Sequence, residues 1–170
     1  MNLVNFLGSL HLCGMIIENV YGFLIEDKIL DNFYLISFLL LPLSWIICKD
    51  ECIISYLLKK YQNPHYQLGD EPENTKDISD LFPSSNYYLF FYHSNHLLRI
   101  VSIIIVNNRN TSYSSQISYY LFYPTLIMYS IYIYDITFRL CYRNRLYPYF
   151  QILFSAFLFT LLYDKLFHFP

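Results

Sequence analysis

Charged residues are scarce in this sequence and make up 14% of its 170 residues. Soluble globular domains usually carry about a quarter, so an ordinary soluble domain is not expected. The formal net charge is −2, and the chain therefore lacks the basic surface that neutralises the phosphates of nucleic acids. We exclude a nucleic-acid partner on this ground.

Recognisable enzyme motifs are lacking as well. The sequence contains no nucleotide-binding loop and no local signature of a catalytic triad. Five histidines are too few for a membrane di-metal desaturase or hydroxylase, and we predict no cofactor. The four cysteines show neither zinc-ribbon nor thioredoxin spacing and imply no disulfide framework. They are Cys13, Cys48, Cys52 and Cys141.

Hydrophobic residues, in contrast, make up 55% of the chain and gather in long stretches. A helix needs about 20 residues to cross about 30 Å of hydrocarbon. We therefore expect an all-α polytopic transmembrane helical bundle with five spans; four are possible, because Phe33–Cys48 is short and contains Pro42. The expected spans are residues 3–25, 33–48, 87–106, 118–138 and 146–167. The first lacks the basic start and cleavage site of a signal peptide, so we expect it to be retained.

The one sizeable polar region lies between the second and third spans, at residues 50–85. Asp50–Tyr61 is apolar on one side and ends in Lys59 and Lys60, a pattern typical of an interfacial helix. Asn63–Ser85 is rich in acids and prolines and is expected to be a loop. This region is a candidate surface for a protein partner.

Lysine and arginine counts predict the orientation, because cytoplasmic loops are enriched in them. One side would hold Lys49, Lys59, Lys60, Lys76, Arg139, Arg143 and Arg145. The other would hold Lys28, Arg109 and Lys165. These counts favour a cytoplasmic N-terminus and an external or lumenal C-terminus. The glycosylation sequon at Asn110 would then lie outside.

One face of the first span is small and polar. His11, Gly14, Met15, Glu18 and Gly22 lie within about 120° of arc on a helix. Such a face usually packs against another helix, with the glycines allowing close approach of the backbones. We expect it to point into the bundle.

Histidines of two spans are expected at one depth. His93, His96 and Arg99 share a stripe of the third span, which runs parallel to the first, and His11 lies level with His93 and His96 at about 1.5 Å of rise per residue. The three histidines could bind a metal ion, but hydrogen-bonded histidines in the bundle core are favoured. They are assigned no metal.

Glu18 and Arg99 are also expected to lie level. Each alone would be costly inside a membrane, and opposite charges at one depth offset each other's desolvation. We predict an ion pair that holds the first span against the third. The polar cluster inside the membrane is thus His11, Glu18, His93, His96 and Arg99.

Cys48, Asp50, Glu51 and Cys52 form an interfacial group. The favoured interpretation is that they cap and anchor a helical turn. Alternatives are a zinc site completed by His65 or a catalytic cysteine, which would need a base such as His65 beside it.

The chain is rich in residues that AT-rich codons encode, among them tyrosine, phenylalanine, isoleucine and asparagine. With this composition, the segment Trp45–Asp70 (WIICKDECIISYLLKKYQNPHYQLGD) resembles small uncharacterised multi-pass membrane proteins of large DNA viruses of protists. The resemblance covers about a sixth of the chain and implies no activity.

The function that these observations favour is non-enzymatic. The bundle would bind a lipid, a small ligand or a partner protein. One alternative is a small lipid-modifying or metal-dependent membrane enzyme that uses the histidines with Cys48 or Glu18. Another is proton or ion conduction through His11, Glu18 and Arg99.

Overall fold

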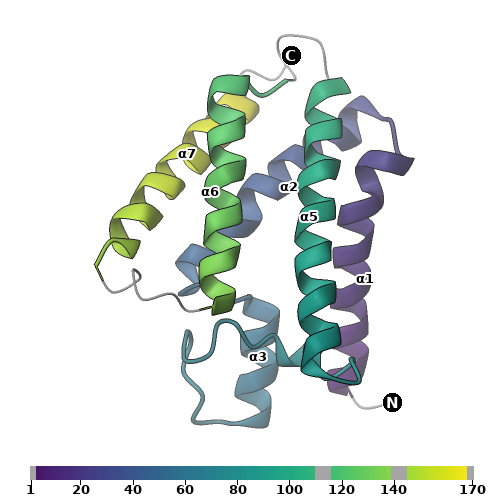
Figure 1. Cartoon of the computed structure of the whole chain (residues 1–170), viewed down its shortest axis with the longest axis vertical. Coiled ribbons are helices and arrows are strands. Elements are labelled where there is room, and N and C mark those ends of the chain that lie inside the picture. The colour runs from purple at the N-terminus through teal and green to yellow at the C-terminus, as the bar shows by residue number, and fades with distance from the viewer. Residues whose placement is uncertain (1–2, 110–115, 139–144, 168–170) are drawn as a thin grey trace.

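The computed structural model describes residues 3–109, 116–138 and 145–167, and within them the chain is all-helical. The helices are α1 (Leu3–Leu24), α2 (Lys28–Ile47), α3 (Ile53–Gln62), α4 (Lys76–Ser79), α5 (Ser85–Arg109), α6 (Tyr119–Phe138) and α7 (Tyr147–Phe167). The predicted helical bundle is confirmed. The five long helices correspond to the five predicted spans and run alternately in opposite directions (Figure 1).

Four described helices, α1, α2, α5 and α7, are long and apolar enough to cross a membrane, as expected of a multi-pass membrane protein. α6 is not among these four; it has 20 residues, of which six are tyrosines and one is Asp135. Asp135 is fully buried, so this charge faces the bundle rather than lipid.

The start of α2 differs from the prediction, because α2 begins at Lys28 rather than Phe33. The Asp27 side chain caps the helix by accepting hydrogen bonds from the N–H groups of Ile29 and Leu30, which satisfies donors that the first turn leaves free. Asp31 is buried in this first turn and pairs with Arg109 at the end of α5. Asp31, which the sequence analysis left outside the second span, therefore ties α2 to α5.

α1 and α5 lie side by side and run parallel, as predicted (Figure 1). Asn19 of α1 bonds to Asn95 of α5, and further along both helices the N–H of Gly22 bonds to the Ser102 hydroxyl at 2.8 Å. A Cβ at Gly22 would overlap Ser102. The predicted close approach at this glycine is confirmed.

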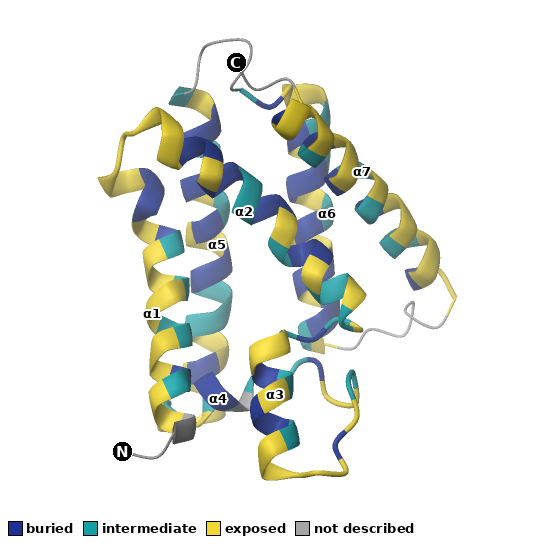
Figure 2. Ribbon diagram, turned by 180° about the vertical axis from the view of Figure 1, so that it is seen from behind, coloured by how far each residue is buried: buried dark blue, intermediate teal, exposed yellow. Residues whose placement is uncertain are grey.

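The apolar core lies where α2 crosses between α5 and the α6–α7 pair. Its fully buried members include Leu35, Phe38, Leu39, Ile103, Val106, Tyr129, Tyr132, Phe154 and Leu158. The outward faces of the long helices, by contrast, expose large apolar side chains (Figure 2). Such faces suit contact with lipid hydrocarbon, where exposing apolar surface costs little.

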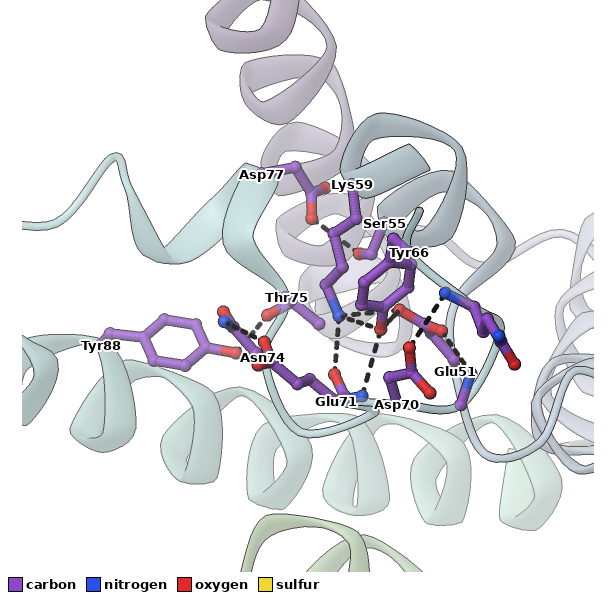
Figure 3. A network of polar contacts seen from close by, with 12 residues as sticks. Glu51, Ser55, Lys59, Tyr66, Asp70, Glu71, Asn74, Thr75, Asp77 and Tyr88 are labelled. Carbon is purple, nitrogen blue, oxygen red and sulfur yellow. Dashed lines mark hydrogen bonds and ion pairs between the residues drawn. The ribbon is translucent and has the colours of Figure 1, made fainter. Parts of the chain in front are cut away.

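α3 and α4 lie together at the end of the bundle where α1 and α5 begin (Figure 2). The ammonium group of Lys59 is buried between the Glu51 carboxylate, at 2.7 Å, and the Tyr66 hydroxyl, at 3.1 Å (Figure 3). Lys59 lies in the last turn of α3, as the sequence pattern indicated, but it does not end the helix as a solvated charge. Instead, this lysine folds the following loop back onto α3, because a buried ammonium group needs partners.

Candidate functional site

A cavity of about 960 Å³ lies between α1, α2, α3 and α5. Most of its lining is apolar and includes Leu10, Ile17, Trp45 and Leu57. A few polar side chains interrupt this lining. They include His11 and Glu18 on α1, Cys52 before α3, and Asn95, His96 and Arg99 on α5. A large apolar cavity with a few convergent polar groups is the usual form of a small-molecule site.

At the α3–α4 end of the cavity, three side chains form a hydrogen-bonded chain. The Cys52 Sγ lies 3.8 Å from the His11 Nε2. The His11 Nδ1 lies 2.7 Å from the Asp77 Oδ2. We call this group the Cys52–His11–Asp77 triad. Nucleophile, base and orienting carboxylate in this order are the arrangement that activates a nucleophilic cysteine.

Ser55 extends the chain by one member. Its hydroxyl donates to the Asp77 Oδ1 at 2.6 Å (Figure 3), so both carboxylate oxygens of Asp77 are held. Ser55 and Asp77 are both buried. The carboxylate is therefore fixed from two sides, which fixes the orientation of the His11 ring.

Each triad member comes from a different element. His11 lies on α1, Cys52 is the residue before α3, and Asp77 lies in the short helix α4. α4 packs on α1 at Gly8, where a Cβ would overlap the carbonyl oxygen of Asp77. The close approach that Gly8 allows brings the Asp77 side chain to His11, one turn further along α1.

The partners of His11 fix its tautomer. A carboxylate only accepts hydrogen bonds, so the Nδ1 carries the proton that goes to Asp77, and the Nε2 faces the Cys52 sulfur, where it can hold the proton that the thiol gives up. Burial raises the pKa of the Asp77 carboxyl, but the hydrogen bonds from His11 and Ser55 outweigh it and bring the pKa below its usual value. The triad is thus set for proton transfer from sulfur to the ring.

The Cys52 thiol has a lowered pKa. Burial raises the pKa of this thiol. The hydrogen bond and the charge of His11 lower it, as do the N–H groups of Ser55 and Ile54, and together they outweigh burial. Cys52 also occupies the N-cap position of α3, where the positive end of the helix dipole favours an anion. The Cys52 thiol therefore ionises more readily than an ordinary cysteine, and the thiolate is the nucleophilic form.

The structure brings Cys52 to a base other than the one considered from sequence. His65 is exposed in the loop after α3, and His11 takes its place beside the thiol. In the part of the chain that the structure describes, no group of three His, Cys, Asp or Glu side chains could hold a metal ion. The zinc interpretation of Cys48, Cys52 and His65 thus gains no support.

The three membrane histidines do not share one set of contacts. His11 and His96 both line the cavity, but the His96 Nδ1 bonds to the Tyr129 hydroxyl at 2.8 Å. His93 stacks on Phe138 at 5.6 Å between ring centroids and is not part of the cavity lining. His96 bonded to a tyrosine in the core is the favoured interpretation from sequence.

The predicted ion pair of Glu18 and Arg99 is confirmed. The Arg99 Nη2 lies 3.3 Å from the Glu18 Oε2. Arg99 is buried with 5% of its side chain exposed, whereas Glu18 is 28% exposed. The pair lies on the cavity wall deeper than the triad, because Glu18 is two turns along α1 from His11.

Other predicted positions have structural roles. Asp50 accepts hydrogen bonds from Tyr132 of α6 and Gln151 of α7 at 2.8 and 2.7 Å, and Glu51 pairs with Lys59. Both agree with the predicted anchor. Cys48, at the end of α2, is a free thiol.

Gly14 and Asn110 complete the predicted positions. A Cβ at Gly14 would meet nothing within 4 Å, so this glycine lines the cavity instead of allowing helix contact. Asn110 lies outside the described residues.

Sequence reasoning missed Asp77 and Ser55. Asp77 is one of several acids in the segment that was expected to be an acidic loop, and no local spacing distinguishes it from its neighbours. No family model, curated protein or solved structure matches this chain, so its function is inferred from the geometry of its own side chains.

Proposed function

We propose that this protein is a membrane-embedded cysteine acyl hydrolase or acyltransferase that acts on long-chain esters or thioesters. The observation that carries the proposal is the Cys52–His11–Asp77 triad at the end of an apolar cavity. This proposal keeps the lipid-modifying alternative of the sequence analysis but replaces Cys48 or Glu18 by Cys52 as the nucleophile, with His11 as its base. It is preferred to non-enzymatic binding because binding alone requires no ordered nucleophile, base and carboxylate.

The proposed reaction has two steps, acylation of Cys52 and then deacylation. His11 takes the thiol proton, the Cys52 sulfur bonds to the acyl carbon, and the bond from that carbon to the leaving oxygen or sulfur breaks. The leaving group departs with the proton from His11. Water or an acceptor hydroxyl or thiol then gives its proton to His11 and attacks the thioester, which frees the Cys52 sulfur.

The cavity indicates an acyl chain as the substrate's main recognition element. The wall next to Cys52 includes Leu10, Ile54 and Leu57, which suit a hydrocarbon chain through burial of apolar surface. α3, which begins after Cys52, carries the amphipathic pattern expected of an interfacial helix. The thiol would then lie near the level of lipid ester groups.

The proposed orientation suits a cysteine nucleophile. A cytoplasmic N-terminus places the loop of residues 63–85, and with it Asp77, on the cytoplasmic side. Thiols stay reduced there, so Cys52 remains available for attack.

The test is trapping of an acyl-enzyme. The full chain in detergent or nanodiscs is incubated with a hexadecanoyl thioester, and Cys52 acylation is read by intact mass and by release with hydroxylamine. We expect acylation in the wild type and none in Cys52→Ser. His11→Asn and Asp77→Asn should acylate at least about tenfold more slowly, as expected for loss of a general base or its orienting group.

The matched control is Cys13→Ser, which removes an exposed cysteine two residues from His11 and should acylate as the wild type does. Equal acylation of Cys52 and Cys13, or an acylation rate that His11→Asn leaves unchanged, would contradict the proposed enzymatic activity. The His11–Asp77 bond would then be a tether between α1 and α4.

A further inference from the structure

A second polar site lies deeper in the same cavity, at Arg99. Its Nε and Nη2 have no hydrogen-bond partner among the described side chains, although the Glu18 carboxylate lies 3.3 Å from the Nη2. The neighbouring His96 Nε2 also has no partner there. Buried donors without partners are unusual in folded proteins and call for an explanation.

The unpaired edge of Arg99 has a preferred ligand. The Nε and one terminal nitrogen of a guanidinium form a fork that two oxygens of a carboxylate or phosphate can occupy together. Glu18 lies 3.3 Å from the Nη2 without hydrogen-bond geometry and therefore does not bond the two nitrogens of this fork. Glu18 is also the more exposed of the two, with 28% of its side chain accessible, so it is the partner that a ligand can displace.

The surrounding membrane favours a ligand that brings its own proton. A carboxylic acid can pass its proton to Glu18 and pair with Arg99 as a carboxylate, so that the cavity holds one cation and one anion both before and after binding. A phosphodiester carries no such proton and would add an uncompensated negative charge, which is costly in a low-dielectric interior. The charge balance therefore selects a carboxylic acid.

The shape of the cavity favours a long chain on that acid. Between the triad and Arg99 the wall of α1 is formed by Gly14 and Met15, and Ile17 adds apolar surface. Gly14 has nothing within 4 Å of its Cβ position, which leaves room for a chain that runs from Arg99 toward α3. This space is apolar and continuous with that around Cys52.

We propose that the Arg99 end of the cavity binds the carboxylate of a long-chain fatty acid, which displaces and protonates Glu18. This site shares its cavity with the Cys52–His11–Asp77 triad but uses other polar groups, and binding of the acid does not depend on the triad's chemistry. The other titratable groups around it are His93 and His96 of α5, Tyr34 of α2 and Tyr129 of α6.

The test is equilibrium binding of radiolabelled hexadecanoic acid to the purified full chain in nanodiscs. Hexadecanol and hexadecyl methyl phosphate, a phosphodiester, serve as competitors. We expect the acid to compete at least about tenfold better than either, because the alcohol lacks the charge that strengthens bonds to the fork and the phosphodiester brings no proton for Glu18. The bound label should be released by organic extraction, whereas covalent label would resist extraction and require hydroxylamine, so recovery of the unmodified acid separates this site from acylation of Cys52.

Two substitutions should act in opposite directions. Arg99→Gln should weaken binding at least about tenfold because the fork is lost. Glu18→Gln should tighten it severalfold, because the competing carboxylate is removed. Wild-type affinity should also rise toward low pH, by up to about tenfold per unit where one proton is taken up. Glu18→Gln should lose most of this dependence.

A third substitution tests the position of the chain. Gly14→Phe should block binding by filling the cavity, whereas Cys13→Phe, which adds the same ring at the next residue and outside the cavity lining, should not. If Arg99→Gln does not fold, Glu18→Gln and Gly14→Phe still decide. Equal binding of hexadecanol and the acid, preference for the phosphodiester, or weaker binding in Glu18→Gln would overturn the proposal.

Discussion

Gly8 of α1 and Asp77 of α4 are in such close contact that no side chain fits between them, since a Cβ at Gly8 would overlap the Asp77 carbonyl oxygen. This contact holds α4 against α1 one turn before His11. The position of the carboxylate that orients His11 thus depends on a glycine, because only a residue without a side chain fits here.

Gly8→Ala should therefore weaken both stability and the triad. The clash is with backbone, which cannot rotate away, so we expect a loss of about 1–3 kcal/mol in detergent melts and slower alkylation of Cys52. Gly14→Ala is the matched control in the same helix, where a Cβ meets nothing within 4 Å. It should be neutral or stabilising by up to about 1 kcal/mol. Similar losses in both variants would show that the α1–α4 contact is not close.

The pH profile of Cys52 alkylation should reveal the contribution of His11. A lowered pKa keeps the sulfur ionised to lower pH, so the rate with iodoacetamide should reach half its maximum at a lower pH than for a model thiol. In His11→Asn only burial and the N–H groups of α3 remain. Because burial is the largest of these influences and raises the pKa, the midpoint should move above that of the model thiol. The measurement is the rate of Cys52 modification followed by peptide mass, and an unmoved midpoint would contradict the His11 contact.

The Glu18–Arg99 pair should give an asymmetric double-mutant cycle. Glu18→Gln leaves a charge that is 5% exposed without its partner, whereas Arg99→Gln leaves one that is 28% exposed. We expect a loss of about 3 kcal/mol for the first and a smaller loss for the second. The double variant should lose less than the sum of the two. Melting in detergent measures all four proteins, and additive losses would show that the two residues do not interact.

Reporter fusions should test the orientation. The lysine and arginine counts predict that a reporter at the C-terminus lies outside the cytoplasm and that one inserted between residues 63 and 85 lies inside. Protease protection reads both positions. A cytoplasmic C-terminus would mean that one of the five long helices does not cross, and α6 is the candidate because it carries six tyrosines and Asp135.

The sequence alone was sufficient to predict the helices, their membrane character and one long-range contact. Long apolar stretches indicate membrane-spanning helices, because a backbone in hydrocarbon must satisfy its own hydrogen bonds. Glu18 and Arg99 could be paired because a charge inside a membrane needs a partner at its own depth and the chain offers few. Both predictions follow from the high cost of unpaired backbone groups and unpaired charges in hydrocarbon, a cost that can be assessed for each helix separately.

Only the tertiary structure decided the triad and the cavity. His11 is separated by 41 residues from Cys52 and by 66 from Asp77, and no spacing rule connects residues on α1, before α3 and in α4. Their meeting depends on the packing of α4 at Gly8 and on how the loop folds back through buried Lys59. The region outside the spans is polar, so the membrane places little constraint on it, and its fold follows from specific contacts that periodicity does not reveal.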